Sequence, residues 1–139
     1  IWKRGEGAGL AAMNTREAAQ RLLNEAARYL GTPYVWGGYS PSGFDCSGFV
    51  SYCLTNSGVR NTGRLTAQGL YDICTPVSQS EAQPGDLIFF TGTYDAGVPV
   101  THIGIYVGNG QMIHCGHPVQ YTSINSPYWQ SHFYGFGRW

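Results

Sequence analysis

Cys46 occupies the position in this sequence that is best suited to nucleophilic chemistry. It follows Asp45 in the segment GFDCSG, and Asp45 is a good N-cap for a helix over residues 46–57. A thiol in the first turn of a helix faces the positive end of the helix dipole and unpaired N–H groups, which favour the thiolate. The same N–H groups can hold the oxyanion that forms when a carbonyl is attacked. We therefore predict that Cys46 is a nucleophile, the alternative being a buried structural thiol, as we expect for Cys53, Cys74 and Cys115.

A thiolate nucleophile needs a base beside it, and the pattern around His102 makes this residue the candidate. In residues 101–107 the β-branched residues alternate with others, so Ile103, Ile105 and Val107 are predicted to face the core and His102 the opposite side. His117 and His132 lie outside this alternation and are expected to be ordinary polar residues.

His114 is the candidate to orient His102, provided that the turn between the two strands has the right geometry. A three-residue loop at 108–110 would pair Val107 with Gln111 and put His114 on the face of His102. A two-residue loop would put His114 on the opposite face. The Cys–His–His hypothesis therefore depends on a turn that is odd in length or accompanied by a β-bulge.

A metal site and a cofactor site are not predicted. Cys46, His102, His114 and Cys115 are all residue types that bind zinc, but no spacing matches a zinc module and none of the cysteines forms a CxxC pair. Neighbouring strand residues such as His114 and Cys115 also point to opposite faces of a sheet.

The composition excludes several classes of partner. Eight Lys and Arg balance eight Asp and Glu, so no bulk charge draws the chain to nucleic acid. No run of about 18 apolar residues predicts a membrane span. Charged residues make up only 12% of the 139 residues, whereas Gly and Tyr are abundant, with 20 and 10 copies. This composition favours a turn-rich surface for a neutral, extended polar ligand such as a peptide or glycan.

The elements that must position these residues follow an α+β order. Residues 1–13 are interpreted as a linker from an upstream region, and the domain as residues 14–139. Helical spacing and caps predict three helices, and apolar runs predict four strands. Helices are expected at 14–30, 46–57 and 66–73, a surface loop at 32–43, and strands at 86–90, 102–107, 111–115 and 134–139. The helices should pack on one face of an antiparallel sheet.

Five segments in order, TPYVWGG, GFDCSGFV, RLTAQ, QPGDLIFF and THIGIYVGNGQMIH, make the sequence similar to the NlpC/P60 cysteine peptidases. The resemblance runs from about residue 14 to residue 139 and implies a papain-like fold. It implies that Cys46 is the nucleophile, His102 the base and His114 the third polar residue.

The same resemblance implies a set of substrate-binding residues. Tyr34 matches a tyrosine near the nucleophile, and Asp45 and Ser47 match positions that bind a free amine or the backbone of the substrate. Arg64 matches a substrate-contacting arginine, although Leu65 stands where a small polar residue is usual. The alternative for Arg64 is a solvated surface role.

The function implied by the resemblance is hydrolysis of peptidoglycan. Members of the family typically cleave the bond between γ-D-glutamate and the diamino acid of the stem peptide. An amidase or acyltransferase with the same chemistry, and a non-catalytic wall-binding module, remain alternatives. The expected setting is extracellular or at a bacterial cell wall, with a monomeric peptidase domain attached to an upstream wall-hydrolase domain.

Overall fold

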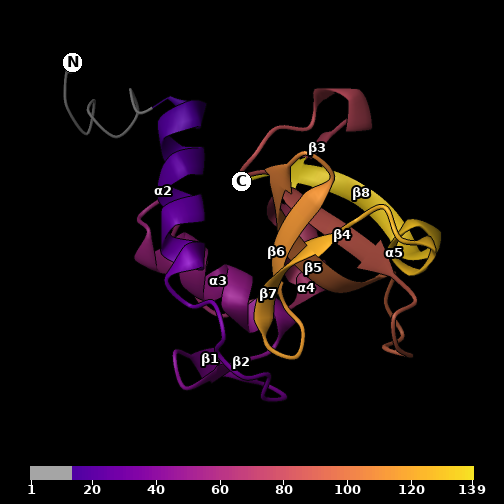
Figure 1. Ribbon diagram of the computed structural model, residues 1–139, viewed down its shortest axis with the longest axis horizontal. Coiled ribbons are helices and arrows are strands. Elements are labelled where there is room, and N and C mark those ends of the chain that lie inside the picture. The colour runs from indigo at the N-terminus through magenta and orange to yellow at the C-terminus, as the bar shows by residue number, and fades with distance from the viewer. Residues whose placement is uncertain (1–13) are drawn as a thin grey trace.

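The computed structural model describes residues 14–139, so the expected linker at 1–13 lies outside the described residues. A six-stranded antiparallel sheet has the order β3–β8–β4–β5–β6–β7, and Figure 1 shows α2 and α3 on one side of it and α5 at its far side. The strands are β3 (Thr75–Val77), β4 (Leu87–Thr91), β5 (Val100–Gly108), β6 (Gln111–Cys115), β7 (Val119–Ser123) and β8 (Phe133–Arg138). The helices are α2 (Thr15–Ala27), α3 (Cys46–Asn56), α4 (Ala67–Ile73) and α5 (Pro127–His132), with a 3₁₀ turn at Gln79–Glu81. The predicted α+β class is confirmed.

The three predicted helices begin within one residue of their expected starts. Asn14 forms a capping box with Glu17 at α2, and the side chains of Asp45 and Thr66 cap α3 and α4. The end of α2 was predicted too late, because the helix stops at Ala27. Leu30 has helical spacing from the buried residues, yet it lies in the turn beyond the helix and is 45% exposed.

Both faces of the sheet are apolar, and each is covered. Alternate residues such as Phe89 and Ile103 face α3 and α4 in the larger core, to which α2 contributes by packing on α3. The intervening residues, such as Phe90 and Met112, form a smaller core on the other face, against which Trp129 of α5 packs. His102 lies on this second face, beside Phe90 and Trp129. His102 therefore lies on the face of the sheet opposite the larger core.

The turn between β5 and β6 combines the two alternatives that the sequence left open. Gly108 pairs with Gln111 across a two-residue turn, in which Asn109 and Gly110 have φ angles of 53° and 73°. The next pair is Tyr106 with Met112, so one residue, Val107, is left over as a β-bulge. Without the bulge, a two-residue turn would place His114 on the face opposite His102. The extra residue shifts the pairing by one, so both histidines project from the same face of the sheet.

Two short strands, β1 (Tyr39–Ser40) and β2 (Gly43–Phe44), form at the end of the loop predicted at residues 32–43, and both contact α3. The backbone N–H of Asp45 donates to the carbonyl of Gly38 at 3.1 Å. A Cβ at position 48 would collide with that same carbonyl. Glycine at position 48 therefore allows the loop to reach the residues around Cys46.

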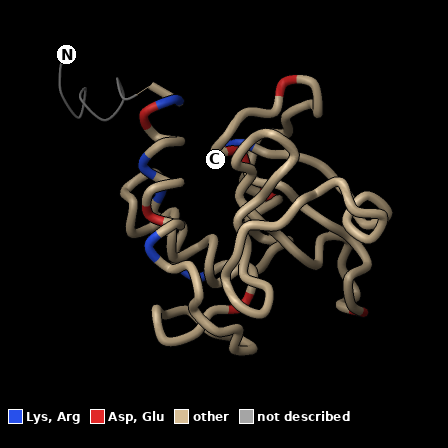
Figure 2. The backbone as a smooth tube through the Cα atoms, in the orientation of Figure 1, with Lys and Arg blue, Asp and Glu red and all other residues tan. Residues whose placement is uncertain are grey.

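The charged residues are unevenly distributed. Figure 2 shows them gathered along α2, whereas the strands carry few. An exception is Asp86, which precedes β4 and pairs with Arg138 of β8 at 2.7 Å. No helix within residues 14–139 has the length and apolar character needed to cross a membrane.

Candidate active site

The Cys46 side chain lies where the start of α3 meets β5. Its Sγ atom is 3.9 Å from the carbonyl oxygen of Thr101. Thr101 is itself a bulged residue, because Phe90 pairs with His102 while the next residue of β4, Thr91, pairs with Val100. The thiol therefore contacts the backbone immediately before His102.

The electrostatics of the thiol differ from the sequence prediction. Burial, followed by the nearby Asp45 carboxylate, raises the pKa of the Cys46 thiol to about 11. Hydrogen bonds from the backbone N–H groups of Ser47 and Ile103, and the charge of Arg64, act in the opposite direction. The helix start thus stabilises the thiolate as predicted, but desolvation outweighs it, and the expected lowered pKa is wrong.

Two histidines and a threonine form a hydrogen-bonded chain on the second face of the sheet. His102 Nε2 lies 2.9 Å from His114 Nδ1, and His114 Nε2 lies 2.9 Å from Thr122 Oγ1. The predicted contact between His102 and His114 is therefore present. Thr122, on β7, was not singled out by the sequence analysis, because its contribution depends on the pairing of β6 with β7.

Trp129 packs against both imidazole rings. It stacks on His102 with ring centroids 5.1 Å apart and meets His114 edge-on at 5.4 Å. Burial, with a further contribution from the neighbouring His114, lowers the pKa of His102 to about 3. Burial also lowers the pKa of His114 to about 4. Both rings are therefore neutral at pH 7, as a general base requires.

A cavity of about 560 Å³ opens beside Cys46. All four residues that the resemblance assigned to substrate binding line it, together with Trp36, Gln68 and Tyr94. The assigned residues are Tyr34, Asp45, Ser47 and Arg64. Of the three predicted catalytic residues, Cys46 lines this cavity, whereas His102 and His114 do not.

Arg64 is held against two of these residues. Its guanidinium donates to Asp45 Oδ2 at 2.6 Å and to Ser47 Oγ at 2.9 Å. Asp45 Oδ1 accepts from the backbone N–H of Gly48 at 2.6 Å, so the carboxylate also caps α3. The alternative of a freely solvated Arg64 does not describe this geometry.

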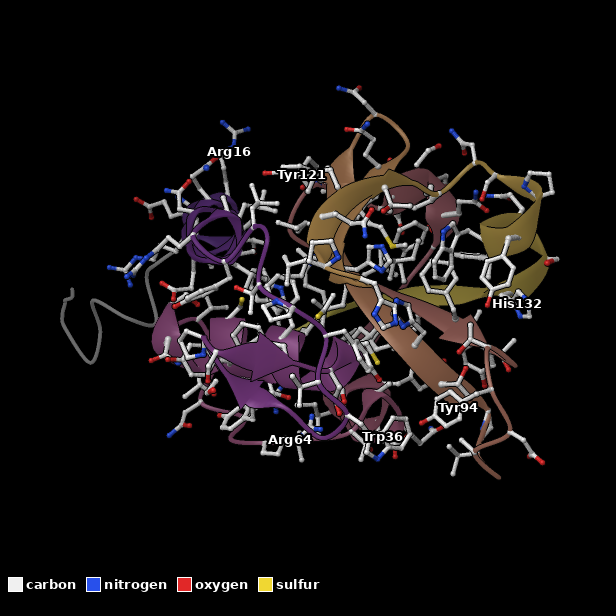
Figure 3. All side chains as sticks on the ribbon, turned by 60° about the horizontal axis from the view of Figure 1, so that its bottom comes forward. Arg16, Trp36, Arg64, Tyr94, Tyr121 and His132 are labelled. Atoms are coloured by element: carbon white, nitrogen blue, oxygen red, sulfur yellow. The ribbon has the colours of Figure 1, made fainter. Side chains whose placement is uncertain are left out.

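Two exposed aromatic residues of the cavity wall were missed. Trp36 and Tyr94 meet edge to face with ring centroids 5.8 Å apart, and both are at least half exposed. Figure 3 shows them side by side, with Arg64 along the same side of the molecule. They come from two loops that are distant in sequence, so the sequence alone does not predict this contact.

The helix that carries Trp129 could have been predicted. Ser126 followed by Pro127 is a typical helix start, and Ser126 caps α5 in the structure.

The remaining histidines and cysteines have structural surroundings. His117 packs on Tyr34 with ring centroids 4.9 Å apart, and His132 Nδ1 lies 2.7 Å from the carbonyl oxygen of Thr91. All four cysteines are free thiols, and Cys53 and Cys115 are fully buried. Cys46 is the cysteine that lines the cavity.

The sequence profile described as the NlpC/P60 family matches residues 31–138. This chain belongs to the NlpC/P60 family. The match includes Cys46, His102, His114 and the whole cavity wall.

Two curated relatives and one solved structure place the chain within this family. It is 44% identical over 121 residues to the bifunctional muramidase/DL-endopeptidase CwlT of Bacillus subtilis, and the aligned region covers 86% of this chain and 36% of CwlT. It is 48% identical over 118 residues to the probable endopeptidase p60 of Listeria seeligeri, covering 84% and 21%. The crystal structure of a lipoprotein-like NLP/P60 protein of Staphylococcus aureus Mu50 superposes with a TM-score of 0.83 at 43% identity, covering 90% of this chain and 42% of that one. The matched region therefore spans less than half the length of each of these relatives.

Proposed function

We propose that this protein is a peptidoglycan hydrolase, a cysteine endopeptidase that cleaves the bond between γ-D-glutamate and the diamino acid of the stem peptide. The observation that carries the proposal is the position of the Cys46 thiol, which lines the cavity and touches the backbone beside the paired imidazoles of His102 and His114. The endopeptidase names of CwlT and p60 support the reaction class.

The proposed reaction is acyl transfer through a thioester. As Cys46 Sγ attacks the γ-glutamyl carbonyl carbon, its proton passes to His102 Nδ1, because Nε2 is occupied by His114. Backbone N–H groups at the start of α3 stabilise the oxyanion. Collapse of the intermediate breaks the C–N bond, and His102 returns the proton to the leaving amine. Water then attacks the thioester and releases the acid and the free thiol.

In the cavity wall, Arg64 is hydrogen-bonded to both Asp45 and Ser47. We propose that these three residues bind the substrate together. Asp45 and Ser47 supply acceptors for a free amine or for backbone N–H groups of the peptide. Arg64 supplies N–H donors for a carboxylate. Tyr34 lines the same cavity as Cys46.

We further propose that the protein acts as a monomeric domain at the outside of a bacterial cell, attached to an upstream wall-hydrolase domain. The support is the partial coverage of CwlT, whose name joins a muramidase to an endopeptidase, and of p60.

The test is mass spectrometry of purified muropeptides after digestion. The wild type should release a fragment that ends in γ-D-glutamate and a fragment that begins with the diamino acid, whereas Cys46→Ala and His102→Ala should give no product, since nucleophile and base act as a unit. Cleavage between the muramyl group and alanine would instead indicate an amidase. Transfer to an added amine would indicate an acyltransferase. Binding of muropeptides without products in the wild type would indicate a wall-binding module.

A further inference from the structure

The hydroxyl of Thr122 ends the chain of polar side chains that begins at His102. Thr122 lies on the edge strand β7, opposite Met112, and its side chain is half-buried. His114, between Thr122 and His102, is only 4% exposed. Each of its ring nitrogens lies 2.9 Å from one of these neighbours.

A neutral imidazole has one N–H group and one lone pair, so this chain allows two proton arrangements. In the first, His102 Nε2–H donates to His114 Nδ1, and His114 Nε2–H donates to Thr122 Oγ1. This arrangement leaves the lone pair of His102 on Nδ1. In the second, every donor and acceptor is exchanged, and the proton of His102 sits on Nδ1, where it blocks the transfer from Cys46.

Only the first arrangement is compatible with the protonated state of His102. Once Nδ1 has taken the thiol proton, the imidazolium must donate from Nε2, so His114 Nδ1 must accept. His114 must then carry its own proton on Nε2. Within residues 14–139, the partner placed to accept that N–H is Thr122 Oγ1.

We propose that Thr122 is a positioning residue of the hydrolase, whose hydroxyl oxygen accepts the His114 Nε2–H and thereby holds His102 in the tautomer that receives the Cys46 proton. The inference rests on the proposed function, because the tautomer has a consequence only if His102 acts as the base. Thr122 exchanges no proton itself. In acylation the thiol proton passes from Cys46 through His102 to the leaving amine, and in deacylation a proton of the attacking water passes through His102 back to the Cys46 sulfur.

The first test compares Thr122→Val, which keeps the shape but removes the hydroxyl, with Thr122→Ser, which keeps the hydroxyl. We expect kcat/KM on muropeptides to fall roughly 10-fold or more in Thr122→Val, since a buried N–H loses its acceptor. Thr122→Ser should stay within about 3-fold of the wild type. Tyr121→Phe, which removes a hydroxyl from the neighbouring, exposed position of β7, is the matched control. Wild-type kinetics in Thr122→Val, or equal losses in the Val and Ser variants, would overturn the proposal.

The second test uses the wild-type protein without substrate, so it does not depend on whether a variant folds. Nitrogen chemical shifts of the histidine rings in the wild-type protein at pH 7 report which nitrogen carries the proton. His114 should be protonated on Nε2 and His102 on Nε2, whereas protonation of His114 on Nδ1 would refute the role of Thr122. Because this measurement does not depend on turnover, an absence of muropeptide cleavage would contradict the proposed function without deciding the tautomer.

Discussion

At the level of single side chains, the proposed nucleophile and the proposed base both rest in their neutral forms. Burial raises the pKa of Cys46 to about 11, and burial together with His114 lowers the pKa of His102 to about 3. A preformed thiolate–imidazolium pair is therefore disfavoured in the ligand-free protein. In the proposed mechanism, proton transfer therefore accompanies the attack, when negative charge moves from sulfur to the substrate oxygen and the N–H groups at the start of α3 can stabilise it.

Removing the charge of Asp45 should make Cys46 more reactive. The Asp45 carboxylate contributes to the raised pKa of the thiol, so Asp45→Asn should lower that pKa and increase the thiolate fraction at pH 8. Asparagine can still cap α3. We expect the rate of alkylation by iodoacetamide at Cys46, measured by peptide mapping, to rise several-fold.

The matched control is Asp72→Asn, which removes a carboxylate from another part of the same cavity wall. Its alkylation rate should equal that of the wild type. An unchanged or slower rate in Asp45→Asn would show that the carboxylate does not hold the thiol in its neutral form.

At the level of elements, the β5–β6 hairpin decides whether the two histidines meet. Gly104 makes room for His114, because a Cβ at position 104 would lie 3.1 Å from the Cβ of His114 and 2.9 Å from the Sδ of Met112. The bulge thus determines the face from which His114 projects, and Gly104 leaves space for the His114 side chain on that face.

Gly104→Ala should consequently impair hydrolysis more than its small size suggests. The added methyl group must displace His114 or Met112, so we expect kcat/KM to fall at least 10-fold and stability by about 1–3 kcal/mol. Gly135→Ala in β8 is the matched control, because a Cβ there meets nothing within 4 Å. Steady-state kinetics and thermal unfolding measure the two effects, and equal results for the two variants would contradict this account.

Local signals in the sequence predicted most of these elements. Asp45 marked the start of α3, because a cap bonds only to its own first turn. The Asn109–Gly110 turn likewise follows from the backbone preferences of two residues. The β-bulge at Val107 could be named only as a condition, since it depends on how two whole strands pair.

Contacts between segments that are distant in the chain could not be predicted from the sequence. The stacking of Trp129 on His102 and the bond from His114 to Thr122 each join separate elements. The pKa of Cys46 was predicted in the wrong direction for the same reason, because desolvation depends on everything that packs around the thiol. The residue types at the site were predictable, but their electrostatic state was not.

At the level of the whole molecule, the buried histidines couple stability to pH. The pKa values of His102 and His114 fall from 6.5 to about 3 and about 4, mainly through burial. Between about pH 6.5 and pH 4 the unfolded chain therefore binds protons that the native protein does not. The free energy of unfolding should decrease as the pH falls through this window, by up to about 1.4 kcal/mol per pH unit for each histidine.

Denaturant unfolding between pH 7 and pH 5 measures this slope. His114→Gln, which keeps a hydrogen-bonding side chain without a titrating ring, should reduce the slope by the share of one histidine. A slope identical to that of the wild type would mean that burial of His114 does not oppose its protonation.

The position of β8 has a consequence for the order in which the protein can assemble. This strand, built from residues 133–138, lies in the interior of the sheet, where it pairs with β3 on one side and β4 on the other. Synthesis from the N-terminus therefore delivers β3 and β4 long before the strand that joins them. Until those residues emerge from the ribosome, both strands present unpaired edges, which are the surfaces most prone to intermolecular pairing. A chain truncated just before Phe133 would keep Cys46, His102 and His114, yet it would lack the strand that joins β3 to β4.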